Sequence, residues 1–180
     1  MIEDCSFILT TVGLLIRELL LDDWQAMQRI GGHPSVAPTL ATFTSPWVEV
    51  EVKTWSVHSL FRGRPGFRAA IVLSEFGVIG SLGLDKAPGP ENQSCAYFID
   101  PAFWGQGYAT VALWCFLKTF GPRFDLSEIG ANHFEDNPTS GAVLRKLGFK
   151  KSGSGMAKSQ ARLEPAPVTL YRLKLEELKA

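Results

Sequence analysis

Apolar and polar residues alternate along the chain in a pattern that predicts short strands and amphipathic helices, separated by glycine and proline. Apolar runs such as FRAAIVL are typical of strands, and apolar residues three or four positions apart are typical of helices. The pattern predicts strands at residues 12–19, 67–73, 78–84, 94–99, 126–132, 149–153 and 168–175. It predicts helices at 22–31, 45–62, 108–120 and 138–147, and a loop at 154–167.

Capping residues mark most of the predicted helix ends. Asp22 predicts the N-cap of the first helix, and Asn137, which precedes a proline, predicts the N-cap of the last. Between residues 45 and 62 the alternation VEVEV would also suit a strand, but Ser45 followed by Pro46 and the length of the segment favour a helix. The pair Gly121-Pro122 is expected to end the third helix.

The order of these elements predicts the fold. Three successive strands joined by short loops form an antiparallel meander, and a strand–helix–strand crossover follows it. This order predicts an α+β fold with a mixed, largely antiparallel sheet of about six or seven strands, flanked by about four helices. A chain of 180 residues without internal repeats suits a single domain over residues 1–180.

Composition and charge exclude several classes of protein. Hydrophobic residues make up 46% of the chain, which is too much for a disordered protein and enough for a sizeable core. Eighteen basic and eighteen acidic residues give zero formal net charge, so no overall field attracts nucleic acid or an anionic membrane. The longest apolar run, VGLLIRELLL, carries two charges and is too short to span a bilayer. We therefore expect neither a nucleic-acid nor a membrane partner.

The cysteines indicate no metal site. Cys5, Cys95 and Cys115 lack the CxxC or Cys/His spacing of a metal centre, and each lies in an apolar stretch. They are expected to be buried, reduced thiols, which together with the lack of a signal peptide indicates a cytoplasmic protein without a metal cofactor.

A glycine-containing loop, WGQGYAT, lies between the strand SCAYFI and an apolar helix. Glycines at this point free backbone N–H groups at the N-terminus of the helix to hold an anion. A dinucleotide-binding loop would need a third glycine where the chain has Thr110, and the Gly-Lys-Ser/Thr of a Walker loop is missing. The pattern leaves open whether the loop holds another anion or is a tight turn without a ligand.

In its context, IDPAFWGQGYAT resembles the acetyl-coenzyme-A loop of the GNAT N-acetyltransferases. The stretch NPTSGAVLRKLGF at 137–149 and the opening TTVGLLIREL extend the resemblance to the branch of ribosomal-protein N-terminal acetyltransferases (RimJ/RimL-like). Trp104 is usual in that branch, whereas Val111 replaces a common Glu and Gly13 replaces an Arg. The resemblance implies the GNAT fold and an acetyl-CoA-dependent transfer to an amine.

The resemblance also implies where acetyl-CoA binds. The backbone of Phe98 and Ile99 would pair with the pantetheine arm, and the N–H groups of the glycine loop would hold the pyrophosphate. Asn137 and Ser140 would contact the coenzyme arm, although a simple helix cap or local backbone bonding would also explain them. The implied loop residues are Trp104, Gly105, Gln106, Gly107, Tyr108, Ala109 and Thr110.

Candidate catalytic residues follow the fifth predicted strand, at 126–132. By the same resemblance, Ser140 would donate to the leaving thiolate, with Asn137 beside it. Glu135 is a candidate general base, as are His133 and Asp136, although polar residues of a solvent-exposed turn would look the same.

Arg145 stands where many family members have a tyrosine acid. The predicted reaction is direct attack by an amine in a ternary complex, since Cys95 and Cys115 have no neighbouring base for a covalent route. The acceptor is expected to be the α-amine of a protein, a peptide or an amino-acid-like molecule. The sequence leaves open a non-catalytic acyl-CoA-binding module and a polyamine or antibiotic acetyltransferase. It also leaves the oligomeric state open, with a homodimer as one candidate.

Overall fold

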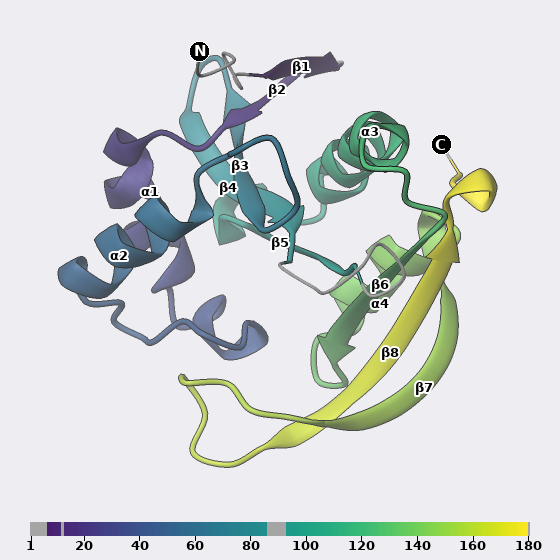
Figure 1. Cartoon of the computed structure of the whole chain (residues 1–180). Coiled ribbons are helices and arrows are strands. Elements are labelled where there is room, and N and C mark those ends of the chain that lie inside the picture. Colours follow the sequence, from purple (N-terminus) through teal and green to yellow (C-terminus); the bar gives the residue numbers. More distant parts are fainter. Residues whose placement is uncertain (1–6, 12, 86–92, 180) are drawn as a thin grey trace.

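The structure, a computed structural model, describes residues 7–11, 13–85 and 93–179, so Cys5 lies outside the described part. Its strands form two antiparallel sheets (Figure 1). The first sheet has the order β1-β2-β3-β4-β5 and the second the order β6-β8-β7. The strands are β1 (Ile8–Thr11), β2 (Leu14–Glu18), β3 (Phe67–Leu73), β4 (Gly77–Leu84), β5 (Cys95–Ile99), β6 (Glu128–Phe134), β7 (Lys150–Ala157) and β8 (Ala166–Lys174).

Helices cover both faces of the first sheet. The helices α1 (Trp24–Gly31) and α2 (Glu49–Ser59) lie on one side, and α3 (Tyr108–Arg123) and α4 (Pro138–Lys146) lie on the other (Figure 1). The predicted α+β fold with four helices is therefore confirmed. Each side has its own hydrophobic cluster, and the larger one, under α3 and α4, also takes in side chains of the second sheet.

The two sheets diverge between β5 and β6. Ser94 forms a parallel bridge with Gly130, and the Gly130 N–H donates to the Gln93 carbonyl at 2.8 Å. Among the described residues this bridge is the one backbone pairing recorded between the sheets. β5 and β6 therefore enclose a gap into which a ligand can enter.

The N-terminal strand prediction was incomplete. Residues 12–19 were expected to form one strand, whereas the chain forms a hairpin of β1 and β2 around Gly13, whose φ is +76°. Only glycine adopts such a φ without strain, so Gly13 permits a reversal inside a continuous apolar run. With the extra strand β1, the described residues form eight strands.

Two predicted N-caps were wrong. α1 begins at Trp24, because the carboxylate of Asp23 rather than Asp22 bonds the Leu20 N–H and pairs with Arg17. α2 begins at Glu49, and the Ser45 hydroxyl donates instead to the carbonyl of Gly32 at 2.8 Å. At Ser45 a tertiary partner, the Gly32 carbonyl, outcompetes the local cap, whereas at α1 another local contact, from Asp23 to the Leu20 N–H, takes its place.

The ends of α3 and β7 also differ from the prediction. α3 continues through Gly121 and Pro122 to Arg123, and Gly121 leaves room for Leu175, whose Cδ1 an added Cβ would meet at 2.7 Å. The predicted loop 154–167 is strand up to Ala157 and again from Ala166. Most of β7 is exposed on both faces, which removes the apolar alternation that would reveal a strand.

Candidate active site

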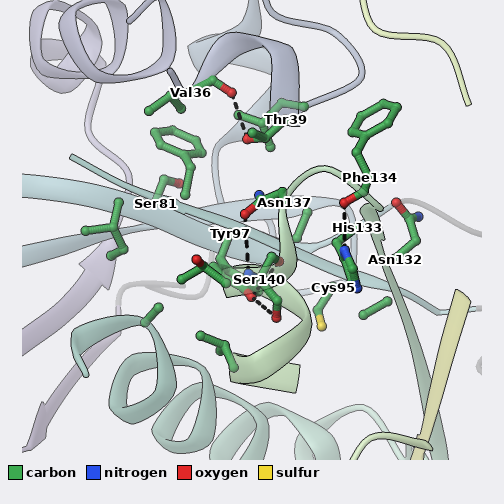
Figure 2. A pocket seen from close by; sticks show the side chains of 18 of the residues that line it. Val36, Thr39, Ser81, Cys95, Tyr97, Asn132, His133, Phe134, Asn137 and Ser140 are labelled. Atoms are coloured by element: carbon green, nitrogen blue, oxygen red, sulfur yellow. Dashed lines mark hydrogen bonds between the residues drawn. The ribbon is translucent and has the colours of Figure 1, made fainter. Parts of the chain in front are cut away.

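A cavity of about 560 Å³ opens along the gap between β5 and β6 (Figure 2). Its walls come from β5, the glycine loop, the start of α3, the β6–α4 turn and the first turns of α4. At the far end it reaches residues 36–43 and Trp55, on the side of the sheet where α2 lies. The cavity therefore connects the two faces of the molecule through the open edge of the sheet.

The glycine loop forms one end of this cavity. Gly105 and Gly107 have φ angles of +75° and +83°, and a Cβ built at either meets nothing within 4 Å. Gly107 precedes the first residue of α3, and no side chain caps that helix. The first-turn N–H groups of α3 and the space in front of them are thus suited to an anion.

Trp104 fixes the loop to β5, because its indole Nε1–H donates to the Ile99 carbonyl at 2.7 Å. Tyr108, Ala109 and Thr110 line the cavity as predicted for the loop. Gln106 does not line it; its side chain is exposed and donates to the Ala102 carbonyl at 3.3 Å. The loop is therefore held by main-chain and indole contacts and leaves its N–H groups toward the cavity end.

Main-chain groups of β5 alternate between β4 and the gap. The Asp100 N–H donates to Ile79 of β4, whereas the carbonyl of Gln93 faces Gly130 of β6. By this alternation the main-chain groups of Tyr97 and Ile99 face the gap and those of Phe98 face β4. Of the two residues predicted to pair with the pantetheine arm, Ile99 presents its N–H to the gap while its carbonyl accepts from the Trp104 indole, and Phe98 lines the cavity.

Three polar side chains meet in the middle of the cavity (Figure 2). The Asn137 side chain caps α4, with Oδ1 accepting from the Ser140 N–H at 3.4 Å. Ser140 Oγ lies 2.8 Å from the hydroxyl of Tyr97, and that hydroxyl is also 3.1 Å from the Ser140 carbonyl. The predicted cap at Asn137 is thus observed, and the predicted pair Asn137 and Ser140 lies together in the cavity.

Sequence reasoning missed Tyr97. Burial raises the pKa of its phenol, so the hydroxyl stays protonated at any ordinary pH. The available signal was its place two residues before Ile99, which puts it on the same face of β5 and toward the same gap.

The three candidate bases lie in different surroundings. His133 is buried in β6, its Nδ1 is 2.7 Å from the Phe134 carbonyl, and its Nε2 is 3.4 Å from the hydroxyl of Tyr171. Nδ1 must carry the proton to donate to a carbonyl, so Nε2 is the nitrogen that can accept. Glu135 is exposed and lies outside the residues that line the cavity.

Asp136 is exposed and forms a bidentate ion pair with Arg162, at 2.7 and 2.8 Å. Hydrogen bonding from Arg162 lowers the pKa of Asp136. A carboxylate whose pKa is lowered in this way is a weak base, so its role here is to hold Arg162.

Arg162 belongs to a segment that closes the far end of the cavity, which we call the strap (residues 158–165, between β7 and β8). Its Nε–H donates to the Pro38 carbonyl at 2.7 Å, and its guanidinium lies 4.3 Å from the Phe134 ring centroid. The Gln160 N–H donates to the Ala41 carbonyl at 3.0 Å. The strap therefore joins the segment 36–43 to the β6–α4 turn across the cavity (Figure 1).

The charges along the cavity are mostly positive. Arg68 is ion-paired with Asp85, which also accepts a hydrogen bond from Ser94 Oγ at 2.6 Å. Asp85 is the one acidic residue among the described lining residues, against three basic ones, Arg68, Lys146 and Lys158. Burial raises the pKa of Cys95 to about 12, so this lining thiol stays neutral.

No group of three or more His, Cys, Asp or Glu that could hold a metal ion occurs in the part of the chain that the structure describes. None of the described helices is long and apolar enough to cross a membrane.

Comparisons with known proteins agree with this geometry. The family model described as "Acetyltransferase (GNAT) domain" matches residues 13–150. A search of the curated proteins finds no match. The solved structures show the same fold, and the family model confirms the resemblance to the GNAT N-acetyltransferases.

Three of these structures illustrate the likeness. Ribosomal-protein-S5-alanine acetyltransferase from Vibrio fischeri has a TM-score of 0.80 and 18% identity, covering 98% of this chain and 100% of that chain. Mycobacterium smegmatis RimJ in complex with CoA-disulfide has a TM-score of 0.79 and 19% identity, covering 97% of this chain and 89% of that chain. The Salmonella typhimurium acetyltransferase that modifies the N-terminal serine of ribosomal protein L7/L12 has a TM-score of 0.79 and 18% identity. It covers 93% of this chain and 99% of that chain.

Proposed function

Because the chain belongs to the GNAT family of acetyltransferases, we propose that it transfers an acetyl group from acetyl-CoA to the α-amine of a protein, a peptide or an amino-acid-like molecule. The observation that carries the proposal is the cavity, which runs from an anion-binding helix start, past a pair of hydroxyls, to the opposite face of the sheet. A donor can thus enter from one side and an acceptor from the other.

The residues divide into three groups along the cavity. The N–H groups at the start of α3 hold the pyrophosphate, and Gly105 and Gly107 allow it to approach. The gap-facing main chain of Tyr97 and Ile99 aligns the pantetheine arm as an additional strand would be aligned. Ser140 then lies where the thioester sulfur is expected, with Asn137 holding the first turn of α4.

The structure favours direct attack by the amine. Acetyl-CoA supplies an activated thioester, so the protein has to position the amine and stabilise the leaving thiolate. A covalent route through Cys95 would require its thiolate, and burial opposes that ionisation. Glu135 and His133 remain proposed bases, with His133 the nearer to the cavity.

Two arguments favour an α-amine over a polyamine. An α-amine with a pKa near 7.8 costs about 1 kcal/mol to deprotonate at pH 7, whereas an alkylamine near 10.4 costs about 4.6 kcal/mol. In addition, the one acidic lining residue, Asp85, is already paired with Arg68, so the described cavity offers a polycation no unpaired carboxylate. The similar Salmonella typhimurium enzyme modifies the N-terminal serine of ribosomal protein L7/L12, which fits this acceptor class.

The proposal is tested by following thiol release from acetyl-CoA in the presence of a panel of amines. We expect turnover with short peptides that have free N-termini, none with the same peptides blocked at the N-terminus, and weaker turnover with spermidine. A larger kcat/KM for spermidine than for the peptides at pH 7 would contradict the acceptor class. Binding of acetyl-CoA without turnover of any amine would favour a non-catalytic acyl-CoA-binding module.

A further inference from the structure

The hydroxyls of Tyr97 and Ser140 come from opposite walls of the cavity and meet at 2.8 Å. Tyr97 belongs to β5 and Ser140 to α4, 43 residues later, so only the tertiary fold pairs them. Tyr97 is partly buried, and Figure 2 shows both side chains close together among the residues that line the cavity.

We propose that Tyr97 is a positioning residue for the transfer reaction, which orients the Ser140 hydroxyl and strengthens it as a hydrogen-bond donor to the departing thiolate. This inference rests on the proposed function, since it assigns a role within the same site.

The hydrogen bonds can be counted. The Tyr97 hydroxyl has one proton, which goes either to Ser140 Oγ at 2.8 Å or to the Ser140 carbonyl at 3.1 Å. When it goes to Oγ, the Ser140 proton is free to point at the sulfur, and the two O–H groups form a chain that polarises cooperatively. Either hydroxyl can donate across the 2.8 Å contact, and the negative charge that develops on the sulfur selects the arrangement in which Tyr97 donates to Oγ and Ser140 donates to the sulfur.

Bond changes in the step balance without proton loss from either hydroxyl. The amine nitrogen attacks the thioester carbonyl carbon, the C–N bond forms, the C–S bond breaks, and the electron pair stays on sulfur. The proton released is that of the acetylated nitrogen, and it leaves to solvent or to a base. Both hydroxyls stay protonated, because a thiolate is a far weaker base than an alkoxide and burial raises the pKa of Tyr97.

The position in α4 where many family members have a tyrosine does not supply this hydroxyl here. Arg145 occupies it, and its Nη1 donates to the hydroxyl of Tyr171 at 3.2 Å. Arg145 does not line the cavity, whereas Tyr97 of β5 does and brings a tyrosine hydroxyl to Ser140.

The test is a double-mutant cycle with Tyr97→Phe and Ser140→Ala, measured in single turnovers with saturating acetyl-CoA and a good peptide acceptor. Tyr97→Phe removes only the hydroxyl, and we expect it to lower the rate of the chemical step about tenfold, with KM for acetyl-CoA nearly unchanged. Ser140→Ala is expected to lower it about 10- to 100-fold. In the Ser140→Ala background, Tyr97→Phe should have no further effect, because its partner is gone.

Ser56→Ala is the control, since it also deletes a buried hydroxyl but lies on α2, where Ser56 Oγ donates to the Val52 carbonyl at 2.9 Å, outside the residues that line the cavity. It should leave the rate of the chemical step unchanged. If Tyr97→Phe lowers the rate equally in the parent chain and in Ser140→Ala, Tyr97 acts independently of the serine and the inference is overturned. An unchanged rate in Tyr97→Phe alone would overturn it as well.

A second measurement does not depend on the folding of the variant. Replacing tyrosine throughout with 3-fluorotyrosine makes the phenol a stronger donor, so the rate should rise in the parent chain and not in Ser140→Ala. A rise in both would contradict the proposal. If no amine is acetylated by the parent chain, the proposed function fails, whereas an active parent with an additive cycle refutes only the role of Tyr97.

Discussion

Replacement of Arg162 by alanine should open the strap over the acceptor end of the cavity. Its guanidinium holds three partners, namely Asp136, the Pro38 carbonyl and the ring of Phe134. Because these partners lie in separate segments, the single side chain ties the strap to both the β6–α4 turn and the segment 36–43.

The size of the effect follows from these contacts. The exposed pair with Asp136 contributes about 0.5 kcal/mol, the charged hydrogen bond to the Pro38 carbonyl about 1 kcal/mol, and the cation–π contact with Phe134 about 0.5 kcal/mol. Strap closure should therefore weaken by about 2 kcal/mol, which raises the open fraction about 30-fold. Local opening of this size leaves the rest of the fold intact.

Hydrogen exchange at Gln160 reports the opening, since its N–H donates to the Ala41 carbonyl and Arg162 does not touch that bond. We expect protection of this amide to fall about 30-fold in Arg162→Ala and KM for the acceptor to rise. In Arg162→Lys, protection of the Gln160 amide should lie between that of the parent chain and that of Arg162→Ala. Lysine keeps the positive charge but cannot form the bidentate pair with Asp136.

Lys150→Ala is the matched control, because it removes another ion pair, the one with Glu177, from an exposed position on the C-terminal sheet. It should leave Gln160 exchange unchanged. Unchanged exchange of Gln160 in Arg162→Ala, or an equal effect in Lys150→Ala, would refute the assignment of the strap to Arg162.

Three further outcomes are expected. Gly107→Val should abolish acetyl-CoA binding by calorimetry, whereas Gly77→Val, with a similar φ of +71° and equally open surroundings at the β3–β4 turn, should cost similar stability and leave binding unchanged. Gly141→Ala should lower the free energy of unfolding by about 1 kcal/mol in urea despite its better helix propensity, since the added Cβ would lie 2.5 Å from His133 Nε2; a more stable variant would contradict this packing. Gln160 protection should be constant above the ordinary Asp136 pKa of 3.8 and decline as pH falls through the lowered pKa, and a decline that begins near pH 6 would contradict the ion pair as its cause.

Local sequence signals predicted most of the fold and the donor end of the site. The limits of β3 agree with the prediction, and α4 has its cap at Asn137, because these elements are specified by nearby residues. The glycine loop was recognisable for the same reason, because glycine is the residue that adopts a positive φ without strain, as Gly105 and Gly107 do.

The centre and the acceptor end depend on contacts between distant segments, and the sequence could not show them. In the sequence Tyr97 is an ordinary strand tyrosine, and only the fold brings Ser140 Oγ within 2.8 Å of its hydroxyl. Arg162 lay in a predicted loop of unspecific composition, and its partners are a carbonyl 124 residues away and an aspartate on another turn. Main-chain carbonyls bind any suitable donor, so they leave no pattern in the sequence.

The divergence of β5 and β6 has a consequence for how the molecule unfolds. Side chains of both sheets share one hydrophobic cluster, but the described backbone joins the sheets at the Ser94–Gly130 bridge. We therefore expect the second sheet with α4 to open as a unit before the first sheet, so that its amides exchange before those of β3 and β4. A ligand that spans the gap binds only when both units are in place and would stabilise that state by about 2.7 kcal/mol at a hundred times its Kd. The coenzyme then acts as the missing strand that makes two units unfold as one.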